Sequence, residues 1–545
     1  MERTQLRKDD GRVRLSHELS EGEKEATGNR KAKVLECLKS LNIACAEDNT
    51  PNIAVLGSGG GLRAMIALQG TLVELKNQGL LDAVMYLCGV SGSTWCMSTL
   101  YQEKYWTEKV QVLEESMCAT FSNPCNFQKE LTIATQAAED ELFSLTDDWA
   151  SFFVYTTLKQ YAETKLSEHK DASTNGTNPY PIYAAIEANQ NNDSPETWFE
   201  FTPHESGFSG LGAFVCTEDL GSKFKDGDLK EKREEKNIGY LQGLWGSALG
   251  RMKEIIKFII GTDCTCAHCR TALLFLELYG HATAGEDCEG VFGQLKEVLE
   301  GEKSKNYYKK HFEVHKNWDS MTCEKRMAVC AELVRSFEKE LGGFVSSACK
   351  LVWKTMSCIC HWTWGSTNNF VYKCRDVQST SLTNKELIYL IDAGIAINSA
   401  YPLVLRPERK VKLILSFDFS AKDPFETIKK TAKYCETNHI PFPKIDPEEI
   451  KDIDNPSDCY IFRGKDVPTV MHFPLFNTIN CPAYPPLLVL GEIKKFSQTF
   501  TTFTTHYKEE DVKQLLQKAK MNVSNNKMKI LKEIQQIVSC STKEF

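Results

Sequence analysis

The sequence lacks the features of membrane-spanning, secreted and disulfide-stabilised proteins. No stretch approaches the roughly 18 consecutive apolar residues that cross a bilayer. The charged first ten residues contain no apolar core of a secretory signal. The 21 cysteines among 545 residues are too few for a disulfide scaffold. We therefore expect a cytoplasmic protein with reduced thiols, without a signal peptide or a transmembrane helix.

Signatures of nucleic-acid, nucleotide and metal binding are also scarce. The net charge of −8 argues against nucleic acid as a partner. The glycine cluster Gly57–Gly61 lacks the lysine of a P-loop, and Leu62 stands where a dinucleotide-binding loop needs glycine. Three cysteines and a histidine crowd into 264–269, but no matching second half follows. We therefore predict no metal and no cofactor.

The length allows one large α/β domain with an insertion. Residues 1–34 form a polar N-terminal tail, of which about the first 30 are expected to be disordered. A single domain is predicted over 35–540. Within it, 251–362 changes in character and is interpreted as a variable lid or cap insertion. The lysine-rich segment 511–538 has a helical pattern.

Two strand–turn–helix units follow one another near the N-terminus. The expected elements are a strand at 53–56, a glycine loop at 57–61, a helix at 62–78, a strand at 83–88, a turn at 89–93 and a helix at 94–102. Leu387–Ile391 and Val411–Phe417 are predicted to be further strands of the same sheet. This order predicts an α/β fold with a central, mainly parallel or mixed sheet and helices on both faces.

The turn Gly89-Val90-Ser91-Gly92-Ser93 could present a nucleophilic serine. Small neighbours let the Ser91 hydroxyl project from a sharp turn, and the following helix favours a developing alkoxide. The fifth position is Ser93, where such elbows usually have glycine. Taken alone, an ordinary tight turn explains the pattern equally well.

The glycine loop could supply an oxyanion hole, because consecutive glycines before a helix expose several backbone N–H groups. A tight turn for close packing is the simpler alternative. Both loops follow successive strands, so in a parallel sheet they open at the same edge. That joint placement favours a serine hydrolase over either loop considered alone.

The base of such a hydrolase remains open on these patterns. None of the 11 histidines lies in a clear turn at a strand end, and His204 and His472 are poor candidates. Asp392 ends a predicted strand and could accept the serine proton. Asp-Ala-Gly is more commonly a simple turn, and Asp418 is a rival with similar placement.

Long stretches of the chain resemble a known family. They are AVLGSGGGLRAMIALQG (54–70), GLLDAVMYLCGVSGSTW (79–95), PETWFEFTPHESGFSGLGAFV (195–215), LQGLWGSALG (241–250) and LIDAGIAINSAYPLVLRPERKVKLILSFDFSAKDPFETI (390–428). Over about 35–250 and 363–535 the sequence resembles the catalytic domain of group IV cytosolic phospholipases A2, most strongly the calcium-independent gamma type. The resemblance implies the α/β fold of patatin-like hydrolases, carrying a lid insertion.

The resemblance also implies residue roles. Ser91 and Asp392 take the positions of a Ser–Asp dyad, and Asp392 is preferred to Asp418 on this basis. Gly60 and Gly61 take the oxyanion role. Arg63, which its position in the sequence alone would place on the surface, matches the arginine that contacts the substrate phosphate or stabilises the acyl-transfer intermediate. Arg409 matches a second functional arginine, to which substrate binding is assigned.

The implied function is release of fatty acid from glycerophospholipids through an acyl-serine intermediate, with lysophospholipase and transacylase activity. The alternative is a catalytically inactive lipid-binding protein of the same fold. Expected partners are glycerophospholipids, lysophospholipids and the surface of intracellular membranes, with which the protein would associate peripherally.

Two expectations concern membrane docking. No C2-like module precedes the catalytic region, and five residues follow Cys540, so calcium-driven docking and a prenylated CaaX box are not expected. The lid is predicted to present Leu274, Phe275 and Leu278 to lipid, with a buried helix as the equally weighted alternative.

Overall fold

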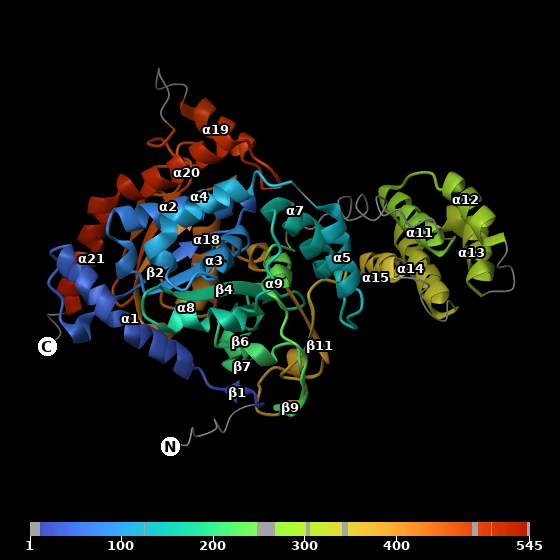
Figure 1. Ribbon diagram of the computed structural model, residues 1–545, viewed down its shortest axis with the longest axis horizontal. Coiled ribbons are helices and arrows are strands. Elements are labelled where there is room, and N and C mark those ends of the chain that lie inside the picture. The colour runs from blue at the N-terminus through green and yellow to red at the C-terminus, as the bar shows by residue number, and fades with distance from the viewer. Residues whose placement is uncertain are drawn as a thin grey trace. The chain divides into compact units, whose positions relative to one another are not determined.

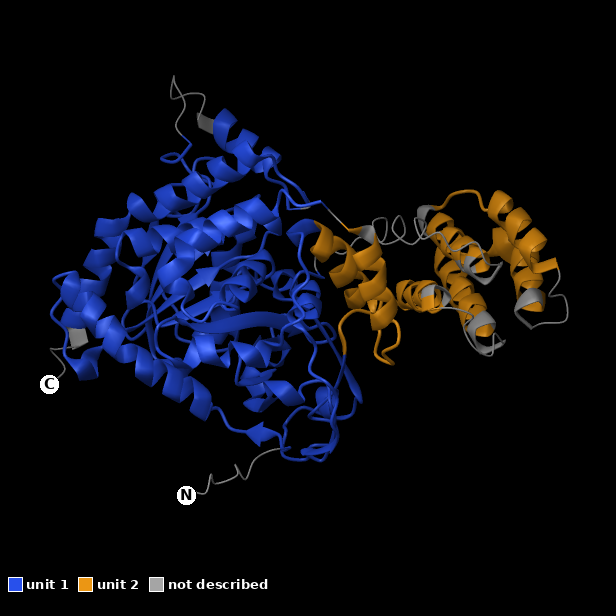
Figure 2. Ribbon diagram, in the orientation of Figure 1, with its two compact units in different colours: residues 1–124, 157–249, 367–545 blue, residues 125–156, 250–366 orange. Residues whose placement is uncertain are grey.

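The chain divides into two compact units (Figure 2). Unit 1 comprises residues 1–124, 157–249 and 367–545, and unit 2 comprises 125–156 and 250–366. The computed structural model describes residues 11–124, 126–247, 267–300, 306–340, 347–481, 489–502 and 504–541. The predicted insertion at 251–362 therefore corresponds to most of unit 2, and residues 125–156 join it.

Unit 1 contains a mixed sheet surrounded by helices (Figure 1). Its strands follow the order β1 (Arg14–Leu15), β7 (Ala213–Cys216), β6 (Glu205–Phe208), β5 (Trp198–Phe201), β4 (Tyr180–Glu187), β3 (Tyr86–Gly89), β2 (Asn52–Gly57), β12 (Val411–Asp418), β14 (Thr469–Pro474) and β13 (Tyr460–Phe462). Off this path lie β10 (Ser366–Asn368) and β11 (Leu387–Asp392). The strands from β4 through β3, β2 and β12 to β14 are parallel.

The predicted strand–turn–helix units are confirmed. The buried apolar residues of β2 lead into the glycine loop and α2 (Leu62–Asn77), and β3 leads into α3 (Gly92–Leu100). Such near-continuous burial is typical of parallel strands covered on both faces. The strands predicted at 387–391 and 411–417 also join this sheet, but β11 pairs with β4 in the antiparallel direction.

The lysine-rich C-terminal segment forms two helices, α20 (Glu509–Ser524) and α21 (Lys527–Ser541). α20 packs against α2 at Gly70, where a Cβ would lie 3.0 Å from the backbone oxygen of Leu516. Several lysines here pair with acidic side chains, for example Lys520 with Glu114 at 2.7 Å. The segment is therefore a docked part of unit 1.

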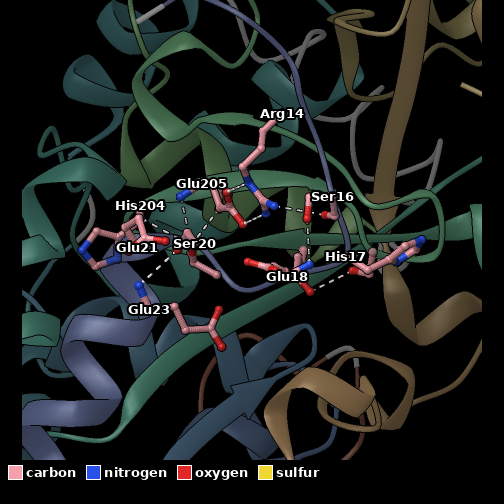
Figure 3. A network of polar contacts seen from close by, with 12 residues as sticks. Arg14, Ser16, His17, Glu18, Ser20, Glu21, Glu23, His204 and Glu205 are labelled. Carbon is pink, nitrogen blue, oxygen red and sulfur yellow. Dashed lines mark hydrogen bonds and ion pairs between the residues drawn. The ribbon is translucent and has the colours of Figure 1, made fainter. Parts of the chain in front are cut away.

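The N-terminal segment is part of the folded core, so the predicted disorder is wrong for the described residues 11–30. β1 pairs with β7, and helix α1 (Glu21–Ser40) follows. In Figure 3 the Arg14 guanidinium points to Glu205, with Nε 2.9 Å from Oε2. Glu23 and Arg30 are 1% exposed. The groups that form hydrogen bonds with the side chains of Glu23 and Arg30 lie far away in the sequence. The polar composition of the segment by itself therefore indicates a solvated tail.

The described part of unit 2 is helical. Its helices are α5 (Phe127–Ala137), α6 (Leu145–Trp149), α11 (Ala267–Ala284), α12 (Glu289–Leu299), α13 (Asn306–Asn317), α14 (Cys323–Glu340) and α15 (Ser347–His361). Leu274, Phe275 and Leu278 on α11 are at most 4% exposed. The prediction that they face lipid is wrong for this structure, because α11 packs against α12, α14 and α15.

Among the described helices, none is long and apolar enough to cross a membrane. The described residues also contain no group of three or more side chains suited to hold a metal ion. Cys264 and Cys266 of the cysteine–histidine cluster at 264–269 lie outside the described residues.

Candidate active site

Ser91 occupies a sharp, strained turn between β3 and α3. Its φ of 53° and ψ of −123° are unusual for a residue other than glycine. A Cβ at Gly89 would lie 2.6 Å from the Met97 sulfur, and one at Gly92 would lie 1.9 Å from the oxygen of Gly61. The flanking glycines are therefore required by close packing, and the turn places Ser91 at the N-terminus of α3.

Ser93, which replaces the usual second glycine of the turn, joins the turn to the glycine loop. Its buried hydroxyl donates to the backbone oxygen of Ser58 at 2.6 Å. Val90 N donates to the oxygen of Gly57 at 3.1 Å. The departure from the common motif thus has a structural explanation, since the serine side chain connects the ends of β2 and β3.

The glycine loop presents backbone donors beside Ser91. Gly60 and Gly61 have φ values of 152° and 62°, which side chains disfavour. Neither N–H donates to a backbone oxygen of the described residues. Both lie at the start of α2, where the helix dipole favours negative charge. This geometry suits the oxyanion role expected of them.

β3 and β11 meet end to end along one edge of β4. Gly89, the last residue of β3, lies opposite Tyr183, and Asp392, the last residue of β11, lies opposite Ala185. β5 occupies the other edge of β4 at these positions. Two positions along a strand span about 7 Å. The carboxyl ends of β3 and β11 therefore converge, with Ser91 following directly after β3.

The segments of Ser91 and Asp392 share neighbouring atoms. A Cβ at Gly59 would lie 3.0 Å from Ser91 Cβ and 3.4 Å from Val90 Cγ1. A Cβ at Gly394 would lie 3.1 Å from Asp392 Oδ1 and 3.7 Å from the same Val90 atom. Gly394 N donates to Asp392 Oδ1 at 2.8 Å, which orients the carboxylate. Ser91 and Asp392 are 3% and 1% exposed, so both lie in a water-poor place, in segments that share Val90 as a neighbour.

The alternative bases have other contacts. The Asp418 carboxylate accepts a hydrogen bond from the Ser58 hydroxyl at 3.4 Å. His472 Nε2 donates to a backbone oxygen at 2.7 Å, and burial lowers the pKa of His472. His204 lies 2.8 Å from the hydroxyl of Tyr180, the first residue of β4. Asp392 pairs with Ala185, near the other end of that strand.

Arg63 is buried, not on the surface as its position in the sequence alone suggests. Its Nε donates to the oxygen of Phe419 at 2.7 Å, and its other nitrogens contact Phe500 O and Thr502 Oγ1. Burial lowers the pKa of Arg63 to about 10. A Cβ at Gly60 would lie 2.7 Å from Arg63 Nη2. The guanidinium thus braces the glycine loop, and contact with a substrate stays a prediction.

Arg409 lies in a buried ion-pair network, and the prediction that it binds substrate is wrong for this structure. Its five N–H groups donate to Glu23, Glu200 and the oxygen of Leu403 at 2.6 to 3.0 Å. Burial opposes the charge, but the two carboxylates raise the pKa of Arg409 well above its usual value. Burial also opposes the ionisation of Glu200, but Arg406 and Arg409 lower the pKa of Glu200 to about 2. The network ties α1 to the sheet.

Sequence patterns gave no signal for several residues around the site. Ser247 accepts a hydrogen bond from the backbone N–H of Asp392 at 3.0 Å. The Asn398 side chain donates to the oxygen of Gly59 at 3.1 Å. Both lie outside the α-helices and strands, where no periodicity or motif spacing marks a contact.

Comparisons with known proteins decide the family. Residues 53–256 match the model of the lysophospholipase catalytic domain. Human cytosolic phospholipase A2 gamma is 40% identical over 539 residues, covering 95% of both chains. The chain belongs to the cytosolic phospholipase A2 family. The mouse gamma protein is 38% identical, covering 95% of this chain and 91% of its own. The expected resemblance to the gamma type is thereby confirmed.

A solved structure of the family confirms the fold. Human GIVD cytosolic phospholipase A2 matches with a TM-score of 0.68 and 24% identity, covering 98% of this chain and 66% of that one. The same human protein in complex with methyl gamma-linolenyl fluorophosphonate matches with a TM-score of 0.66. The predicted α/β fold of cytosolic phospholipases A2 is therefore correct.

Proposed function

We propose that Ser91 and Asp392 form the catalytic pair with which this phospholipase A2-type hydrolase cleaves fatty-acyl esters of glycerophospholipids. The observation that carries the proposal is the convergence of β3 and β11 along one edge of β4. It unites a strained serine turn, a glycine loop with available donors and a buried carboxylate. The names of the relatives supply the substrate class.

The residues divide the reaction into two steps. Asp392 accepts the Ser91 proton, and Ser91 Oγ attacks the ester carbonyl carbon. Backbone N–H groups of Gly60 and Gly61 donate to the oxyanion, and Asp392 returns the proton to the departing lysolipid oxygen. Water, activated by Asp392, then attacks the acyl-Ser91 ester and releases the fatty acid. A carboxylate in a water-poor site is a stronger base, which suits direct transfer without histidine.

Lysophospholipid is a substrate in the same scheme, since it carries the same type of ester. It can also replace water in the second step, because its free hydroxyl can attack the acyl-serine. This would make the site a transacylase, and the proportion of transfer to hydrolysis would rise with lysolipid concentration.

The central test uses Ser91→Ala and Asp392→Asn, with Ser524→Ala as a matched control on an exposed face of α20. We expect both site variants to lose phospholipid hydrolysis by at least about 10⁴-fold while remaining folded. A fluorophosphonate should label Ser91 in the wild type and in the control. Folded wild-type protein that binds lipid without labelling would instead support the inactive lipid-binding alternative.

For membrane contact, we place the docking residues among exposed apolar side chains of unit 2, which would act as the lid. Phe312 and Trp362 are 57% and 46% exposed, unlike Leu274. Phe312→Asp and Trp362→Asp should reduce sedimentation with phosphatidylcholine vesicles several-fold. Met528→Asp, at a 74% exposed position of unit 1, is the control. Unchanged sedimentation of both lid variants would contradict this docking surface.

A further inference from the structure

Three segments of unit 1 converge on the side chain of Asn398. They are the glycine loop, the turn that follows Asp392, and the residues that follow β12. Asn398 Nδ2 donates to the backbone oxygen of Gly59 at 3.1 Å and to the Ser420 hydroxyl at 2.9 Å. Gly59 N donates in return to the backbone oxygen of Asn398 at 3.0 Å. A single half-buried amide thus connects all three segments.

The amide oxygen of Asn398 lies close to both Gly59, beside Ser91, and Gly394, beside Asp392. It would lie 2.4 Å from a Cβ at Gly59 and 3.0 Å from a Cβ at Gly394. The Cβ position at Gly59 also lies 3.0 Å from Ser91 Cβ, and the Cβ position at Gly394 lies 3.1 Å from Asp392 Oδ1. The absence of side chains at Gly59 and Gly394 is what allows Asn398 to reach this place.

The connection continues behind the glycine loop. Ser420 N donates to Asp418 Oδ1 at 2.8 Å, and Phe419 N donates to the Ser58 hydroxyl at 2.7 Å. Ser58 precedes Gly59 directly, so the loop is held from both sides. The Asn398 side chain connects this loop to the turn that follows Asp392.

We propose that Asn398 is a positioning residue that fixes the distance between Ser91, the oxyanion loop and Asp392. The inference rests on the proposed function of Ser91 and Asp392. Transfer of the proton needs the carboxylate and the serine oxygen within hydrogen-bond reach, and small displacements are costly. A shift of about 1 Å can reduce turnover about 10²-fold. Without the Asn398 amide, the turn after Asp392 loses its side-chain hydrogen bonds to Gly59 and Ser420.

Two substitutions test this role. Asn398→Ala removes the hydrogen bonds, and we expect kcat and the rate of fluorophosphonate labelling to fall about 10- to 100-fold. KM should change less than about 3-fold, because uniform substrate binding is untouched. Asn438→Ala is the matched control, since this half-buried amide donates to the oxygens of Asp193 and Tyr434 in another part of unit 1. It should stay within about 2-fold of wild type.

Asn398→Asp supplies a readout that a purely structural role would not change. A second carboxylate near Asp392 disfavours its ionisation, so the acidic limb of the kcat profile should move to higher pH. Asn398→Ala should keep the limb of the wild type. A wild-type labelling rate in Asn398→Ala, or an unmoved limb in Asn398→Asp, would overturn the inference.

The two proposals fail in different ways. If Ser91→Ala retains hydrolysis, the catalytic pair itself is refuted. If the wild type labels at Ser91 and both Asn398 variants behave as wild type, only the positioning role is refuted. Thermal unfolding of every variant shows whether a lost rate reflects a lost fold.

Discussion

The carbonyl oxygen of Gly61 occupies the space beside Gly92 where any other residue would carry its Cβ, 1.9 Å from that position. The glycine loop and the serine turn are therefore in direct backbone contact. This contact holds two strands' ends in register and leaves no room for adjustment by a flexible side chain.

Gly92→Ala should force these two loops apart. Overpacking of this kind destabilises a protein by about 1–3 kcal/mol, and here it also displaces Ser91 from its oxyanion donors. We expect a loss of hydrolysis larger than the loss of stability alone explains, measured by kcat together with urea unfolding. Gly28→Ala is the control, because a Cβ there meets nothing within 4 Å on helix α1. It should stabilise the protein by about 0.5–1 kcal/mol.

Ser93→Ala should weaken the link between the loops while keeping their shape. The backbone oxygen of Ser58 would lose its buried partner, at a cost of about 1–3 kcal/mol. We expect a lower unfolding midpoint in urea and a modest decrease in kcat. The exposed Ser524→Ala should change neither quantity, and equal behaviour of the two variants would contradict the linking role of Ser93.

Glu23→Gln should destabilise the protein without impairing substrate binding. Removing one charge from a buried ion pair costs about 3–5 kcal/mol, because Arg409 keeps its charge in the core. The expected result is a marked fall in the urea midpoint, with KM of the folded enzyme unchanged. A raised KM at full stability would instead restore Arg409 as a substrate-binding residue.

The stability of the wild type should fall in acid through Glu200. Its pKa is about 2 in the folded protein against an ordinary value of 4.5. A carboxylate with a depressed pKa contributes stability above its unfolded value, and this is lost as pH falls through the folded value. Unfolding free energies measured between pH 5 and pH 2 should therefore decrease. Glu200→Gln should be less stable at neutral pH and show a flatter profile over this interval.

Local chemistry made the serine turn and the glycine loop predictable. The glycines of 57–61 and the small residues around Ser91 form patterns within a few residues, which made both loops visible in the sequence. The atoms that a Cβ at Gly57, Gly59 or Gly92 would meet belong to distant segments, at Ser93, Asn398 and Gly61. Buried apolar runs next to the two loops identified β2 and β3. Strand β11 was also visible in the sequence, but its antiparallel course beside β4 was not, because pairing direction depends on contacts far along the chain.

The choice of base shows the same division. Asp392 and Asp418 both end apolar strands, and their patterns alone did not separate them. The resemblance to a family favoured Asp392. The structure shows Asp418 engaged with Ser58 and Ser420 behind the glycine loop, whereas Asp392 approaches the turn of Ser91. Strand ends look alike in sequence because the residues next to them across the sheet lie far away along the chain.

By itself the sequence determined the α/β class, a tight turn at Ser91 and a glycine loop before it, since each is a pattern of apolar or small residues within a short segment. Only the tertiary structure decided where the charged residues belong. Arg409 and Glu23 are 386 residues apart and form one buried ion pair. Because of this pair, the segment around Glu23, expected to be a tail, belongs to the core, and Arg409, expected to bind substrate, ties helix α1 to the sheet. A charged residue is buried where the fold supplies an oppositely charged partner, and the composition of the surrounding segment does not reveal that partner.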